Sequence, residues 1–159
     1  MPLPLVKEGA AMNDKEFLER EISTWKYCPE RLLQLKGFRY FEGGHDILYR
    51  KRTVIGEGGE LQEVENLPNN RVVDNQYGKL VLQKANYILG QPFVIEGDNE
   101  KYVGLLKQIF DKRFMRLLKN AGKAALNGGI AWLYPYFDSD SKLRFRLFPA
   151  YEVLPFWQD

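Results

Sequence analysis

The clearest pattern of apolar and polar positions lies in the middle of the chain, between residues 66 and 92. Apolar side chains recur there every three or four positions, which predicts a helix with a broad apolar face. The residues of this pattern are Tyr77, Val81, Ala85 and Ile88, with Leu80, Lys84 and Tyr87 beside them. Residues that favour turns and helix caps precede it, namely Asn69, Asn70, Asp74 and Asn75. We expect a buried central helix, entered from an asparagine-rich turn, around which the other elements pack.

Gly90 and Pro92 mark the end of the central helix. Gly90 is expected to adopt the left-handed conformation that closes a helix, and Pro92 prevents the helix from restarting. The apolar residues 93–96 then predict a short strand. On this interpretation, Gly90→Val destabilises the fold because a branched side chain is forced toward positive φ.

Two helices are predicted upstream of the central helix. The first follows a cap at Asn13 or Asp14, and the second starts at Pro29, whose missing N–H is not needed in a first helical turn. The second helix ends at Gly43. In its middle, Gly37 costs about 1 kcal/mol relative to alanine. A close contact with another helix would explain that glycine.

The C-terminal half predicts more helix and then extended structure. An apolar helical pattern starts at Asp98 or Asn99, and two helices separated by a bend at residues 111–113 fit it better than one long helix. Three extended segments follow, at residues 130–137, 142–148 and 149–157. The first two are expected to pair as a hairpin because a short polar turn joins them.

Together these elements predict an α+β fold, in which several amphipathic helices pack on a small, mostly antiparallel sheet. Residues 1–12 contain two prolines and no apolar period, so they are interpreted as a flexible arm that precedes a domain of residues 13–159. Residues 56–63 are rich in glycine and glutamate. A flexible hairpin or loop is favoured there over a phosphate loop, because the acidic side chains would repel phosphate.

Composition narrows the class of protein. Of the 159 residues, 45% are hydrophobic and 28% are charged, with a net charge of +2, which is typical of a soluble globular protein. No apolar run approaches the roughly 18 residues of a membrane span, so no membrane partner is expected. Cys28 is the single cysteine, which excludes an internal disulfide and suits a reducing cytoplasm. We interpret Cys28 as a half-buried apolar residue rather than a nucleophile.

No catalytic, cofactor-binding or metal site is predicted, and we expect no enzyme. The chain lacks the nucleophile elbow, the paired Cys-x-x-Cys, the His-Glu-x-x-His motif and the lysine-bearing phosphate loop. His45 is the only histidine, and a structural hydrogen bond is favoured for it over catalysis. Asp138 and Asp140 lack the glycine and the distal glutamate of a calcium loop.

Basic residues gather in two places. Arg50, Lys51 and Arg52 are consecutive, and a second set lies on the polar side of the helix predicted before the final hairpin, including Arg116, Lys119 and Lys123. A solvated surface is the simpler interpretation of both. Contact with DNA phosphates or with an acidic neighbouring subunit is the alternative. A basic nucleic-acid-binding accessory module without catalysis is therefore the second functional hypothesis.

Four segments resemble, in order, the N-terminal part of the portal proteins of tailed bacteriophages, in the siphophage branch. The central segment carries the most specific match, Asn-Asn-Arg-Val-Val-Asp-Asn followed by Lys84, Tyr87, Gly90 and Pro92. The other segments are Tyr40 to Ile47 with Arg50, Gly129 to Tyr136, and Pro149 to Pro155. The resemblance covers residues 35–159.

The resemblance implies a structural protein of the virion. Portal proteins form a homo-oligomeric ring, typically of twelve subunits, at one capsid vertex through which double-stranded DNA is packaged and ejected. The major capsid and scaffolding proteins surround the ring during assembly in the host cytoplasm, and the terminase and the head–tail connector dock on it. This chain resembles the outward-facing wing region. We expect it to be incomplete at the C-terminus, so that terminase and connector contacts belong to missing regions.

The resemblance also implies roles for the matched residues. Asn70, Arg71 and Asn75 would fix the turn that enters the central helix, with Arg71 pairing with a carboxylate. Tyr87, three residues after Lys84, would anchor that helix in the core. Gly90 and Pro92 would set the angle between the helix and the strand that follows it.

Overall fold

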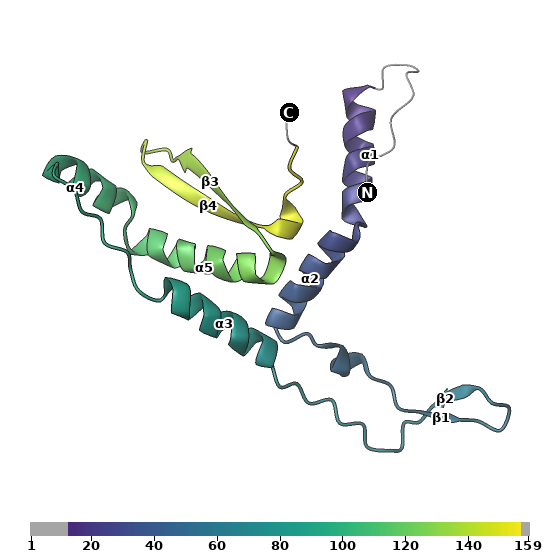
Figure 1. Ribbon diagram of the computed structural model, residues 1–159. Helices are drawn as coiled ribbons and strands as arrows, with labels where there is room; N and C mark the ends of the chain where they lie inside the picture. The colour runs from purple at the N-terminus through teal and green to yellow at the C-terminus, as the bar shows by residue number, and fades with distance from the viewer. Residues whose placement is uncertain (1–12, 157–159) are drawn as a thin grey trace.

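The computed structural model describes residues 13–156, and it confirms an α+β fold (Figure 1). The helices are α1 (Asp14–Lys26), α2 (Pro29–Phe41), α3 (Gln76–Leu89), α4 (Glu100–Ile109) and α5 (Lys112–Gly128), with short 3-10 helices η1 (Asp46–Tyr49) and η2 (Ala150–Glu152). The strands are β1 (Thr53–Ile55), β2 (Leu61–Glu63), β3 (Ala131–Phe137) and β4 (Leu143–Pro149). The predicted arm, residues 1–12, lies outside the described residues.

Helix α5 is the element on which most others pack. In Figure 1 it runs between α3 and the β3–β4 hairpin, and it also contacts α2 and η2. At this contact with α3, Gly122 faces the end of the Leu89 side chain, and a Cβ added there would lie 2.4 Å from Leu89 Cδ1. The predicted central helix, α3, is therefore one neighbour of α5 rather than the centre of the fold.

The side-chain caps explain where four of the helices begin. The Asn13, Asn75 and Asn99 side chains each accept a hydrogen bond from a backbone N–H of the first turn. Asp111 accepts two, from Arg113 N at 2.8 Å and Phe114 N at 2.9 Å. The cap at Asp111 confirms the prediction of two helices with a break there, because it starts α5 directly after α4 ends.

The close helix contact expected at Gly37 is present. A Cβ at this position would lie 2.6 Å from the backbone oxygen of Asn127 in α5 and 3.2 Å from the Tyr77 hydroxyl in α3. Glycine thus lets α2 reach the C-terminal turn of α5. Helix α5 ends at Gly128, and the residue after it, Gly129, closes the helix with a φ of 80°.

The strands form two separate antiparallel hairpins rather than one sheet. The C-terminal hairpin confirms the predicted pairing of the first two extended segments, and in it Ala131 pairs with Pro149 and Phe137 with Leu143. The first hairpin, β1–β2, confirms the interpretation of residues 56–63, and every residue of both strands is exposed. This hairpin stands at the end of a long projection from the helical body, formed by the chain between η1 and α3 and called the arm from here on (Figure 1).

Two predicted strands are absent. Residues 93–96 have no strand partner, because Phe93 packs instead on the rings of Phe110 and Phe114, at centroid distances of 6.0 and 6.4 Å. The last extended segment begins with η2, at Ala150–Glu152, and residues 153–156 pair with no described strand. Residues 157–159 lie outside the described part of the chain.

The prediction for Gly90 was wrong in its mechanism. Gly90 has φ −75° and ψ −29°, a right-handed helical conformation. The constraint there is steric, because an added Cβ would lie 2.2 Å from the backbone oxygen of Asn86.

Gly90→Ala is therefore expected to lower the free energy of unfolding by about 1–2 kcal/mol, and Gly90→Asn should cost about as much. A left-handed cap would instead tolerate asparagine. Urea denaturation measures both, with Gly97→Ala as the control because its Cβ would meet only Val103 Cγ2 at 3.5 Å. If Gly90→Asn were as stable as the parent, the result would support a left-handed conformation of Gly90 and contradict the steric explanation.

Candidate functional site

Asn75 joins three elements at the base of the arm. Its Oδ1 accepts a hydrogen bond from Gly78 N at 2.8 Å, which caps α3, and lies 3.2 Å from His45 Nε2. Its Nδ2 donates to the backbone oxygen of Phe41 at 2.9 Å. One side chain thus connects the end of α2, the segment before η1 and the start of α3. His45 thus makes a structural hydrogen bond, and its partner is a side chain 30 residues away.

Asp46 holds η1 against α2 in the same region. Its carboxylate accepts hydrogen bonds from the Tyr40 hydroxyl and the Arg39 guanidinium, and it lies 3.3 Å from Lys36 Nζ. The Tyr40 ring also packs on the His45 imidazole, with centroids 4.7 Å apart. These contacts fix the direction in which the chain leaves α2 to form the arm.

Asn75→Ala is expected to lower the free energy of unfolding by about 1–2 kcal/mol, because it removes the α3 cap and leaves the Phe41 carbonyl without its donor. Chemical denaturation followed by circular dichroism measures the loss. Asn70→Ala is the matched control, since Asn70 is exposed and its side chain makes no hydrogen bond to the described residues. Equal stability of the two variants would contradict the role of Asn75.

Several carboxylates make the fold sensitive to acid. Hydrogen bonds from Tyr40 lower the pKa of Asp46 below its ordinary value of 3.8, helped by Lys36 and Arg39. The Arg144 guanidinium likewise lowers the pKa of Asp138. A pKa lower in the folded state than in the unfolded state contributes stability above the unfolded pKa.

We therefore expect the urea midpoint to fall as the pH drops below about 4 and these two aspartates become protonated. The loss should be modest because these groups lie at the surface. Denaturation curves between about pH 3 and pH 6 measure it, and Asp46→Asn should flatten part of the profile. A midpoint that rises on acidification would contradict the assigned pKa directions.

The matched residues of the central segment do not gather in one place. Asn75 caps α3 as predicted, but Arg71 is exposed and forms no ion pair with any described carboxylate. Lys84 and Pro92 are also exposed. The prediction for Tyr87 was wrong, because 92% of its surface is exposed. The apolar face of α3 that is buried turns Val81 and Ala85 inward, and at 3.6 residues per turn Tyr87 lies on nearly the opposite side of the helix.

The first basic run closes the base of the arm. Lys51 Nζ lies 2.7 Å from Glu63 Oε2, and Arg52 donates to the backbone oxygen of Pro68 at 2.8 Å. The backbone oxygen of Arg50 accepts from Asn69 Nδ2 at 2.9 Å. Lys51 is therefore paired with a carboxylate and Arg52 with a backbone carbonyl, whereas the Arg50 side chain forms no ion pair with a described residue.

The second basic set borders a groove between α3 and α5. Lys112, Arg116 and Lys119 line one wall, and none of them forms an ion pair with an acidic residue in the part of the chain that is described. The remaining wall and the floor of this groove are mainly apolar, formed by Ile88, Leu89, Pro92, Phe93, Met115 and Leu118. The groove has a volume of about 380 Å³. Lys123 does not line this groove. Its Nζ donates a hydrogen bond to Asn120 Oδ1 at 3.1 Å.

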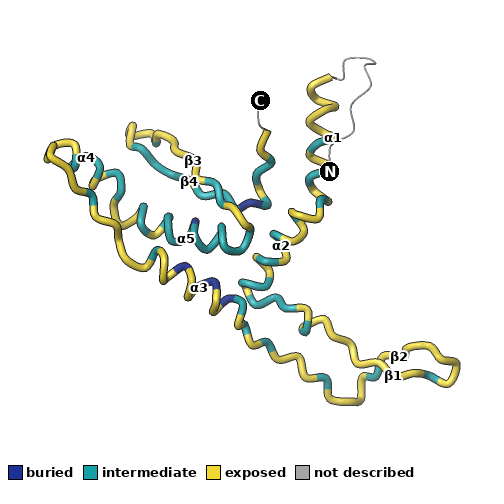
Figure 2. The backbone as a smooth tube through the Cα atoms, in the orientation of Figure 1, coloured by how far each residue is buried: buried dark blue, intermediate teal, exposed yellow. Residues whose placement is uncertain are grey.

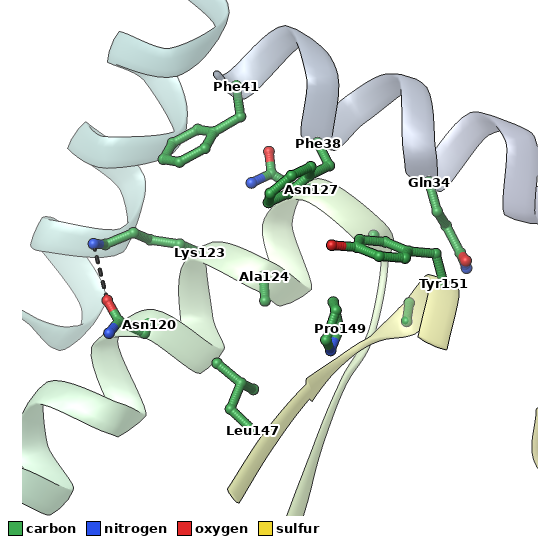
Figure 3. Close-up of a pocket in the computed structure, with 12 residues that line it drawn as sticks. Gln34, Phe38, Phe41, Asn120, Lys123, Ala124, Asn127, Leu147, Pro149 and Tyr151 are labelled. Carbon is green, nitrogen blue, oxygen red and sulfur yellow. Dashed lines mark hydrogen bonds between the residues drawn. The ribbon is translucent and has the colours of Figure 1, made fainter. Parts of the chain in front are cut away.

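A second cavity, of about 270 Å³, lies where α2, α5 and η2 meet (Figure 3). Phe38, Phe41 and Tyr151 line it, and Figure 3 shows the side chain of Asn127, a residue of α5, between Phe41 and Phe38. Asn127 Oδ1 is buried and receives no hydrogen bond from the described residues. This cavity is partly open to solvent, and Asn127 on its lining also makes the close contact at Gly37.

Many large apolar side chains remain on the surface. The buried hydrophobic residues are Val81, Ala85, Ala121 and Ala150, and no large side chain among those described is fully buried. Figure 2 shows the exposed backbone along α1, the arm and α4. Large apolar residues are exposed on each helix from α1 to α4, including Ile22, Leu33, Ile88 and Tyr102. Surface of this extent normally marks contacts with other protein.

The described residues suggest no other chemistry. No group of three or more His, Cys, Asp or Glu side chains within residues 13–156 is arranged to hold a metal ion. None of the helices in that range is long and apolar enough to span a membrane. The sequence identified the two basic sets, but it did not reveal that the second set borders an apolar groove, whereas the pocket beside Arg50, Lys51 and Arg52 is lined mainly by polar residues.

Comparison with known proteins matches most of the chain. The family described as phage portal protein, SPP1 Gp6-like, matches residues 30–159. The portal protein of Bacillus phage SPP1 is 29% identical over 134 residues, which cover 84% of this chain and 26% of that protein. The portal protein of Clostridium phage phiCD119 is 30% identical over 112 residues, covering 70% of this chain and 24% of that protein. The chain thus spans about a quarter of the length of both relatives.

Proposed function

The chain belongs to the SPP1 Gp6-like family of phage portal proteins, and from this premise we propose that it contributes to a subunit of the ring at the capsid vertex. Double-stranded DNA would pass through that ring during packaging and ejection. The role is structural, and we assign no catalytic step or cofactor to these residues. The residues described here would form part of the outward-facing wing of the subunit.

The exposure of apolar side chains is the observation that carries this proposal. A domain that worked alone would bury its large apolar residues, whereas here Leu33, Ile55 and Val72 are 69%, 77% and 80% exposed. Burial against other polypeptide would remove that surface from water, which is the main favourable term in protein association. A protein that functions inside a large assembly has this property.

The partners follow from the same premise. The first partner is a further copy of the subunit, in a homo-oligomeric ring that is typically dodecameric. The major capsid and scaffolding proteins are expected around it. Contacts with terminase and with the head–tail connector are assigned to regions of the subunit outside this chain. The protein would be located at the portal vertex of the virion and in the host cytoplasm during assembly.

Immunogold labelling of the phage particles that carry this gene tests the proposal. An antibody raised against the purified chain should label one site on each head, where the tail joins. The same antibody absorbed with the chain is the control. Labelling spread evenly over the head, or confined to the far end of the tail, would contradict a portal role.

A further inference from the structure

The tip of the β1–β2 hairpin carries acidic residues without basic partners. Glu57 and Glu60, between the two strands, form no ion pair with a described lysine or arginine, and neither does Glu65, which follows β2. Next to the tip, Ile55 pairs with Leu61 across the two strands, so their side chains share one face of the hairpin. They are 77% and 72% exposed. The hairpin therefore presents an apolar pair beside negative charge.

The groove between α3 and α5 has the complementary character. Its floor contains Leu89, Phe93 and Leu118, and its rim carries the unpaired cations Lys112 and Arg116, with Lys119 beside them. An apolar floor with a positive rim matches an apolar pair with a negative tip. Opposite charges at the edge of such a contact would guide approach and fix orientation, while apolar burial would supply most of the affinity.

The hairpin of one chain cannot fill its own groove. The arm joins the N-terminal end of α3, whereas the groove lies at the C-terminal end, where Leu89 and Pro92 line it. The 14 residues of α3 separate them by about 21 Å, and the arm points away from that end in Figure 1. Only a second molecule can bring a hairpin to the groove.

We propose that the β1–β2 hairpin of one copy of this chain docks in the α3–α5 groove of the next copy. The two surfaces are different, so the contact is heterologous and leaves a free hairpin at one end and a free groove at the other. Such a contact repeats from subunit to subunit and forms a closed ring when the rotation per subunit divides a full turn. This inference rests on the proposed portal function and identifies one subunit contact within it.

Docking would also account for an otherwise unstable hairpin. An isolated two-stranded ribbon is marginal in water, and this one has three-residue strands that are exposed on both faces. Seating it between α3 and α5 of a neighbour would bury Ile55 and Leu61 together. The hairpin of a bound copy should therefore be more protected from proteolysis than that of a free copy.

Disulfide trapping between copies tests the contact. In a Cys28→Ser background, a Leu61→Cys chain is mixed with an Ile88→Cys chain that carries a size tag, and both are oxidised gently. Ile88 lines the groove and is 62% exposed. The control partner is Leu33→Cys, which is 69% exposed on α2. We expect at least about five times more mixed disulfide with Ile88→Cys than with the control, corresponding to about 1 kcal/mol of preference.

Charge exchange makes the test specific. Glu57→Lys with Glu60→Lys in the hairpin chain should reduce the mixed disulfide to the control yield, and so should Lys112→Glu with Arg116→Glu in the groove chain. Combining the two pairs of changes should restore it. Glu16→Lys with Glu19→Lys, on α1, changes the charge equally and should leave the yield unchanged.

Equal yields from Ile88→Cys and the Leu33→Cys control would overturn the docking proposal. So would a yield that the charge changes do not alter, or that the combined changes do not restore. These outcomes would leave the portal function intact if gold labelling still marks the vertex. Failure of the labelling experiment would count against the portal role whatever the disulfide yields show.

Discussion

Phe114→Ala is expected to lower the free energy of unfolding by about 2–3 kcal/mol. Phe114 lies in the first turn of α5, and its ring meets those of Phe110, Phe145 and Phe93 at centroid distances of 4.7, 4.9 and 6.4 Å. These rings join the α4–α5 junction, β4 and the segment that follows α3. Truncation would remove edge-to-face contacts from all three and leave a cavity among them.

Urea denaturation followed by circular dichroism would measure the effect of Phe114→Ala. Phe137→Ala is the matched control, because Phe137 is 72% exposed at the end of β3 and makes no ring contact with a described residue. A loss of stability in the control as large as that in Phe114→Ala would contradict the role of the aromatic cluster. The difference between the two variants reports the contribution of the cluster.

Gly37→Ala is the second large effect, with an expected loss of about 2–3 kcal/mol. The added Cβ would lie 2.6 Å from the backbone oxygen of Asn127, so α2 and α5 would have to separate. Helix propensity acts in the opposite direction, since alanine is favoured over glycine by about 1 kcal/mol in a helix interior. Packing between the helices should outweigh that gain, because a backbone atom cannot move aside as a side chain can.

Gly104→Ala provides the control for Gly37→Ala. Gly104 is also inside a helix, but a Cβ there would meet no other atom within 4 Å. This variant should gain up to about 1 kcal/mol, because only the propensity term remains. Thermal melts of the two variants should therefore shift in opposite directions. A Gly37→Ala melt above that of the parent would contradict the close contact between α2 and α5.

Local patterns predicted the elements that depend on neighbouring residues. Helix periodicity placed α3, and the capping residues Asn13, Asn75, Asn99 and Asp111 are all visible in the sequence. The hairpin pairing of β3 with β4 followed from two strands joined by a short turn. A cap or a turn involves only a few adjacent residues, so composition and spacing carry enough information to predict it.

Several predictions that depended on distant contacts failed. Residues 93–96 have the composition of a strand, but no described strand lies beside them, and Phe93 packs on other aromatic rings. Tyr87 is apolar and correctly spaced, yet the direction of α5 decides which side of α3 is covered, and it leaves Tyr87 exposed. The conformation of Gly90 likewise depends on how the chain leaves α3.

The candidate interaction site shows the same division. The sequence showed Glu57 and Glu60 near one another, and likewise Lys112, Arg116 and Lys119, because each set is local. It did not show that the arm extends from one end of α3 and that the cations border an apolar groove at the other end. That arrangement depends on how α3 packs against α5, which involves residues far apart in the chain.

Sequence alone was sufficient to identify the portal family, the α+β class and the limits of most helices. Motif order and short-range periodicity depend only on residues that are close together in the chain. The packing of the chain was needed to find the two hairpins as separate units, the exposure of Tyr87 and the groove opposite the arm. The physical reason is that a side chain becomes buried only when another surface packs on it, and that surface usually comes from a distant part of the sequence. In this chain many of those surfaces have no partner among the described residues themselves.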